Sequence, residues 1–189
     1  MFLDILDDIR WFKEVVNLQI KVSYNNYLKE EFILDLPVEK KVVSNYSNFI
    51  EKYKLTLEDR LLLIFALIPH LEPSFYKDNF TNNHILKHIK SGLGIDEEQI
   101  GFTPKGLIYI FILSGKKLEN RIVIINYLLY KSFLVNKGIV RMLPSPLGEP
   151  VFSGGVALNP EIVKVFFNEK ILQDNDWNNL IHNEYGVST

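Results

Sequence analysis

Cysteine is absent from all 189 residues of this chain. Its absence excludes disulfide bonds, thiolate metal sites and cysteine nucleophiles, and it favours a reducing compartment. We therefore expect a cytoplasmic protein. The rest of the composition is that of an ordinary globular domain, with 47% hydrophobic and 23% charged residues, which is enough apolar material to bury a substantial core.

Long hydrophobic runs are also lacking. The longest, from Leu61 to Pro69, has about half the length that a membrane-spanning helix requires. The N-terminal stretch "MFLDILDDIRWF" places Asp4, Asp7 and Asp8 where a signal peptide would carry positive charge. We expect neither an export signal nor a membrane partner.

A complete phosphate-binding loop is missing as well. In "GFTPKGLIYIFILSG" (101–115), Gly101 and Gly106 have the glycine spacing of the G-x-x-x-x-G-K-[ST] motif. Leu107 and Ile108 stand where the motif has the lysine and the hydroxyl that contact the outer phosphates and magnesium. The segment therefore predicts a turn before a helix. We expect no catalytic residue and no cofactor here.

Other candidates for chemistry are incomplete. His84 and His88 have the spacing of two metal ligands on a helix, but Ile85 follows the first histidine where a zinc protease has glutamate. Ser145 and Ser153 lack the G-x-S-x-G sequence that surrounds a hydrolase nucleophile. We expect no metal site, and we interpret the serines as turn residues.

Helical periodicity and capping signals predict a mainly α-helical chain with a small β-hairpin. Thr56, followed by Glu58 and Asp59, has the pattern of a helix N-cap. It opens a helix through "RLLLIFALI" that is apolar almost all round and that we expect at the centre of the core. Asn159-Pro160 predicts another helix start. The expected helices cover 3–28, 44–55, 57–69, 75–80, 81–90, 104–113, 118–130 and 161–171.

Two of these helices have apolar stripes that we expect to face the core. In helix 118–130 the stripe is Leu118, Ile122, Ile125 and Leu129, so that Lys117, Arg121 and Lys131 partly reach solvent. The stripe in helix 3–28 consists of Ile5, Ile9, Phe12, Val16 and Leu18.

The β-hairpin is predicted near the end of the chain. "IVRML" (139–143) and "VFSGGVAL" (151–158) flank the proline and glycine turn "PSPLGEP". Helices followed by a hairpin is the order of a winged-helix domain. Its third helix would be 104–114, which offers almost no polar group to read a base edge.

The charge is distributed unevenly. The whole chain has a net charge of −2, yet segment 103–143 has seven basic residues against Glu119 alone, a net charge of +6. This excess predicts a surface that binds an acidic protein or nucleic acid, and aromatic residues interleave with it as in nucleic-acid binders. An ordinary solvated helix face is the alternative. The candidate partner-binding residues are Lys105, Lys116, Lys117, Arg121, Lys131, Lys137 and Arg141.

Three segments in order resemble a known family. They are "LTLEDRLLLIFALIPHLEPSF" (55–75), "GFTPKGLIYIFILSG" and "GIVRMLPSPLGEPVFSGGVALNPEIV" (138–163). This pattern is similar to the N-terminal winged-helix-like domain of bacterial AAA+ ATPases associated with contractile injection systems. The chain departs from the family pattern before the Gly-Phe turn, where the family has a glycine-rich stretch and this chain has "HIKSGLGIDEEQI".

The resemblance implies an N-terminal helical extension (1–54), a winged-helix-like domain (55–170) and a C-terminal tail or linker (171–189). It also implies a non-catalytic interaction or regulatory role, with an ATPase module or an injection-system component as the protein partner. Family members continue into an ATPase module, so the chain is expected to be either part of a longer protein or a stand-alone relative. A winged-helix nucleic-acid binder is the alternative function.

We predict that Mg-ATP neither is hydrolysed by this chain nor raises its melting temperature. The physical reason is the missing lysine and hydroxyl after Gly106. Release of inorganic phosphate measures hydrolysis, and differential scanning fluorimetry with and without Mg-ATP measures the melting temperature. A nucleotide-dependent rise that disappears in Gly106→Val would contradict the prediction.

Overall fold

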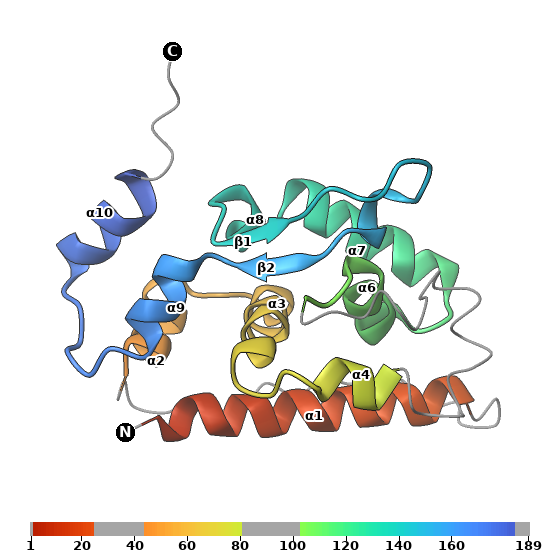
Figure 1. Ribbon diagram of the computed structural model, residues 1–189, viewed down its shortest axis with the longest axis horizontal. Helices are drawn as coiled ribbons and strands as arrows, with labels where there is room; N and C mark the ends of the chain where they lie inside the picture. The colour runs from red at the N-terminus through yellow and green to blue at the C-terminus, as the bar shows by residue number, and fades with distance from the viewer. Residues whose placement is uncertain (1, 25–43, 81–102, 184–189) are drawn as a thin grey trace, which may run out of the picture.

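The computed structural model describes residues 2–24, 44–80 and 103–183, and the expected helix with His84 and His88 lies outside them (Figure 1). The described chain is mainly helical, with a small two-stranded antiparallel sheet, as predicted. In chain order the elements are α1 (Leu3–Tyr24), α2 (Asn45–Lys52), α3 (Leu57–Leu67), η1 (Ile68–His70), α4 (Phe75–Phe80), α6 (Gly106–Ser114), α7 (Leu118–Tyr130), α8 (Phe133–Asn136), β1 (Val140–Met142), η4 (Val151–Ser153), β2 (Val156–Leu158), α9 (Pro160–Phe166) and α10 (Asp174–Asn183).

Helix α3 lies at the centre of the core, as its composition predicts. Every side chain from Leu61 to Leu67 is buried. In Figure 1 α3 is seen almost end-on, with α1 below it and β2 above, and it contacts both elements as well as α8. A helix that is apolar all round is stable in water only when neighbours cover every face, and α1, α8 and the hairpin do so.

The local start signals predicted from the sequence are confirmed by hydrogen bonds. Thr56 Oγ1 accepts the backbone N–H of Asp59 at 3.2 Å and caps α3. Asn159 Oδ1 accepts the N–H of Glu161 at 2.9 Å, and Pro160 occupies the first turn of α9. These contacts satisfy N–H groups that have no partner within their own helix.

The β-hairpin is shorter than predicted on its second side. Val140 pairs with Leu158 and Met142 with Val156, whereas residues 151–153 form the 3-10 helix η4. At Gly154 the two backbones approach closely, since a Cβ atom there would sit 1.9 Å from the carbonyl oxygen of Leu143. Regular pairing covers 140–142 and 156–158.

Helix α1 confirms most of its predicted stripe. Ile5, Ile9, Phe12 and Val16 are buried. Leu18 was expected in the core but is 38% exposed, because a residue two positions after Val16 lies about 200° around the helix axis. The stripe continues instead at Ile20, which is buried.

The segment expected as a C-terminal tail contains α10, which Figure 1 places at the far left of the molecule. Trp177 of this helix is fully buried. Its ring centroid lies 5.3 Å from that of Phe49 in α2 and 6.5 Å from that of Phe166 in α9. An aromatic cluster therefore attaches α10 to these two helices.

Within the described ranges, no helix combines the length and the apolar character that crossing a membrane demands.

We predict that Leu63→Asp prevents folding, whereas Leu6→Asp does not. Leu63 is fully buried in α3, and Leu6 is exposed on α1. An unpaired ionised carboxylate in the core costs several kcal/mol, which is comparable to the roughly 5–15 kcal/mol stability of a whole domain. Soluble yield and thermal melting measure the effect, and we expect the Leu6→Asp melting temperature to move by less than about 2 °C. A sharp melt of soluble Leu63→Asp would place α3 at the surface.

Candidate protein-interaction surface

Three of the predicted basic residues flank α7, two before its first residue and one after its last. Lys116 and Lys117 are exposed immediately before the helix, with Lys117 at its N-cap. Lys131 is exposed at the C-cap. Positive side chains therefore mark both ends of α7.

The other four predicted residues occupy different environments. Lys105 is only 8% exposed, at the N-cap of α6, and it forms an isolated bridge with Gly155. Arg121 is half-buried, and its Nε donates a hydrogen bond to the carbonyl of Gly115 at 3.3 Å. Lys137 ends α8, and Arg141 is an exposed residue of β1. The exposed basic residues beside α7 are therefore Lys116, Lys117 and Lys131, fewer than the seven that the sequence predicted.

The apolar stripe of α7 was expected to face the core, and this prediction was wrong for three of its four residues, since only Ile125 packs against the core. Leu118 is 66% exposed, Ile122 60% and Leu129 46%, and Ile125 is half-buried. Val123 and Tyr130 are exposed on the same helix. We call Leu118, Ile122, Ile125 and Leu129 the outer stripe.

A second set of residues faces inward instead. Ile124 and Leu128 are the buried residues of α7. At 100° per residue they lie roughly 110° around the axis from the centre of the outer stripe. Helix α7 is apolar on more than one side, so its periodicity alone could not select the buried face.

Polar contacts fix the C-terminal end of α7 against α3. The hydroxyl groups of Thr56 and Tyr127 are 2.6 Å apart. Asp59 accepts hydrogen bonds from Ser132 Oγ at 2.6 Å and from the N–H of Phe133 at 3.0 Å. Burial raises the pKa of the Asp59 carboxyl, while these donors act in the opposite direction. They hold the turn between α7 and α8.

The N-terminal end of α7 is fixed through the turn at Gly115. This glycine has φ +57°, and a Cβ atom on it would lie 2.3 Å from Nε2 of Gln19 in α1. This positive φ favours glycine over residues with a Cβ atom. The carbonyl of Gly115 also accepts the hydrogen bond from Arg121. The outer stripe is therefore carried by a helix that is held at both ends.

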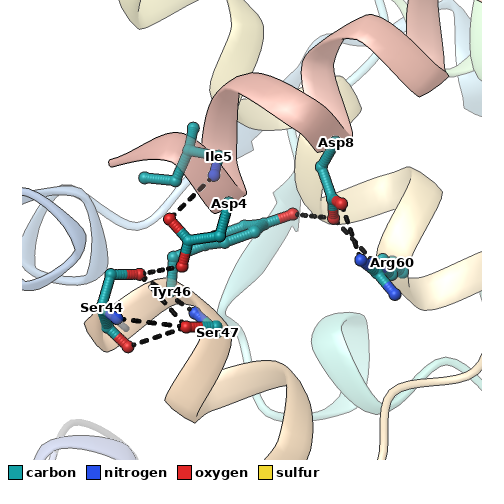
Figure 2. A network of polar contacts seen from close by, with 7 residues as sticks. All are labelled: Asp4, Ile5, Asp8, Ser44, Tyr46, Ser47 and Arg60. Atoms are coloured by element: carbon teal, nitrogen blue, oxygen red, sulfur yellow. Dashed lines mark hydrogen bonds and ion pairs between the residues drawn. The ribbon is translucent and has the colours of Figure 1, made fainter. Parts of the chain in front are cut away.

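The other notable polar cluster joins α1 to α2 and α3 (Figure 2). Asp8 accepts a 2.6 Å hydrogen bond from the Tyr46 hydroxyl, and Arg60 donates to both of its oxygens at 2.7 and 2.6 Å. Ser44 Oγ donates to Asp4. Burial, then the charge of Asp8, raises the pKa of Tyr46 well above its ordinary value, so its hydroxyl stays a donor.

Sequence reasoning missed this cluster. It treated Asp4 and Asp8 only as acids that stand where a signal peptide would carry positive charge. The available signal was their spacing, because residues four apart share a helix face and these two flank the buried Ile5 and Ile9. Each carboxylate is engaged by side chains from α2 or α3, so the cluster serves to fasten helices together.

The other candidates from the sequence were a metal site and a serine nucleophile. In the part of the chain that the structure describes, no three histidine, aspartate or glutamate side chains gather as a metal site would require. Ser145 donates to the carbonyl of Val151 and accepts from the N–H of Gly154, which is a turn role, as predicted.

Comparisons with family models, curated proteins and solved structures found no match to this chain.

We predict that Lys117→Asp raises the melting temperature and that Lys131→Asp lowers it. Lysine at an N-cap adds positive charge to the positive end of the helix, whereas aspartate there accepts an N–H bond. At the C-cap the preference is reversed. A gain of about 1 kcal/mol raises the melting temperature of a domain of this size by about 2–4 °C. Thermal melting of both variants at low salt measures this, and equal shifts would contradict it.

Proposed function

We propose that this chain is a non-catalytic protein-interaction domain that binds its partner through the outer stripe of α7. The exposed outer stripe is the observation that supports the proposal. Single exposed apolar residues are common on protein surfaces, but a row of them along one helix is typical of an interaction site. Burying one such side chain completely contributes about 1.5–3 kcal/mol, so covering the row would contribute favourably to binding, against the entropy lost on association.

The same surface favours a protein partner over nucleic acid. Between the lysines at its two ends, the exposed polar residues of α7 are Glu119, Asn120 and Asn126. Affinity for nucleic acid comes largely from basic side chains on phosphates, and α7 offers few along its length. Helix α6, the reading helix of the expected winged-helix arrangement, is buried from Ile108 to Ile112, so it is not available to a DNA groove.

The fold class and the cellular context extend this proposal. We propose that α3, α6 and α7 with the β1–β2 hairpin form a winged-helix-like core, because helices precede a hairpin in that order. The resemblance of the motifs in 55–75, 101–115 and 138–163 suggests a partner in an AAA+ ATPase or a contractile injection apparatus. The lack of cysteine fits the cytoplasm.

The test compares two double variants in capture from native-cell extract. We expect the immobilised wild-type chain to retain a specific protein, identified by mass spectrometry, and Ile122→Ser/Leu129→Ser to lose at least about tenfold of it. The matched control is Leu3→Ser/Leu6→Ser, which removes two similarly exposed leucines from α1 and should retain the protein.

Thermal melting accompanies the capture experiment, since substitutions at exposed positions change stability little. Retention of the same protein by Ile122→Ser/Leu129→Ser, with an unchanged melt, would remove the outer stripe from the binding site. A salt-sensitive shift of random duplex DNA that persists in this variant would favour the nucleic-acid alternative instead.

A further inference from the structure

The spacing of the outer stripe matches one kind of occupant, another helix. Leu118, Ile122, Ile125 and Leu129 follow one another at intervals of four, three and four residues. This is the interval of the seam positions of a coiled coil, where side chains of a second helix fit between them. Helix α7 has 13 residues, which corresponds to a seam of about 20 Å or nearly two heptads.

The charges at the ends of this seam indicate the charge that the second helix carries. Lys116 and Lys117 precede the stripe, Lys131 follows it, and Glu119 is the one acidic residue of α7. Electrostatic complementarity between surfaces favours a partner with carboxylates at both ends of its apolar stripe. Such residues flank a seam in coiled coils and determine which partner is chosen.

The N-terminal lysines give an independent reason for an acidic partner. They lie at the positive end of the α7 dipole, where basic residues are unfavourable for the helix itself. No side chain caps this end, since the N-cap residue Lys117 makes no cap hydrogen bond. A carboxylate of a bound helix would interact with both lysines and with the helix end.

A second copy of this chain fits the seam less well. Side by side in parallel, two α7 helices bring Lys117 next to its own counterpart. In the antiparallel arrangement, Lys116 and Lys117 of one copy meet Lys131 of the other. Both alignments place lysine-bearing ends together, with Glu119 as the single acidic residue of each α7, and like charges at a contact oppose association.

We infer that the occupant of the outer stripe is an amphipathic helix with acidic residues at both ends, which packs along α7 in a coiled-coil-like manner. The inference rests on the proposed function, because it names the partner of the same surface. It also explains why the N-cap of α7 is a lysine, a choice that is unfavourable for the isolated domain.

The test uses two synthetic helical peptides that differ only in charge. Both are about 18 residues long with leucines at the four-three-four spacing. One carries glutamates at both ends, and the other carries lysines at the same positions. Fluorescence anisotropy with the full chain measures each Kd at low and at high salt. We expect the acidic peptide to bind about tenfold more tightly or better, and added salt to reduce this preference.

Three variants of the chain separate the contributions. Ile122→Ser should weaken binding of both peptides, because it removes a seam residue. Lys117→Asp should weaken only the acidic peptide while raising the melting temperature, a combination that a destabilised protein would not give. Lys77→Asp makes the same charge change on α4, at an exposed position, and should leave both affinities unchanged.

The alternative outcomes each overturn a defined statement. Equal affinity for the two peptides, or no binding of either, overturns the inference that the occupant is an acidic helix. The proposed function still stands in that case if capture from extract depends on Ile122 and Leu129. If light scattering shows that the wild type is a dimer and Ile122→Ser/Leu129→Ser a monomer, the occupant is a second copy of the chain. This outcome also overturns the inference. If, in addition, Ile122→Ser/Leu129→Ser captures the same protein as the wild type, both the proposed function and the acidic-helix inference fail.

Discussion

The need to cover α3 on every side is the constraint on which the rest of the structure depends. Its residues from Leu61 to Leu67 are buried on all faces, so a single neighbouring element cannot cover the helix. Helix α1 covers one side, the β1–β2 hairpin another, and α8 contacts both α3 and β1. These contacts bring together segments that are far apart in the chain.

The polar start of the same helix determines how two of these neighbours are oriented. Asp59 holds the first residues of α8 through Ser132 and Phe133, and the adjacent Arg60 pairs with Asp8 of α1. Apolar packing is largely non-directional, whereas these hydrogen bonds require one geometry. Loss of one partner from a buried ion pair costs about 3–5 kcal/mol, so the Asp8 and Arg60 pair contributes to the choice of a single arrangement.

This arrangement leaves α7 with more apolar surface than the core can cover. The helix is fixed at Gly115 and at Tyr127, and these contacts turn Ile124 and Leu128 inward. Leu118, Ile122 and Leu129 of the outer stripe are then exposed on a helix that is held at both ends, with lysines beside them. A preorganised surface of this kind loses little conformational entropy on binding, which favours the interaction role that we propose.

The sequence by itself determined the local elements. Thr56 and Asn159 marked helix starts, and residues 118–130 were predicted with their observed bounds. Caps and turns involve residues a few positions apart, so their physics is contained in short segments. The same reasoning identified α3 as the core helix, because no other environment suits its composition.

Only the tertiary structure decided which face of α7 is buried and what Asp4 and Asp8 contact. Periodicity identifies a stripe on a helix, but α7 has two apolar faces, and the positions of α6 and α8 selected the one with Ile124 and Leu128. Asp8 received its role from Tyr46 and Arg60, which are 38 and 52 residues away in the chain. The direction in which a side chain points depends on neighbours that are distant in sequence, and local spacing carries no information about them.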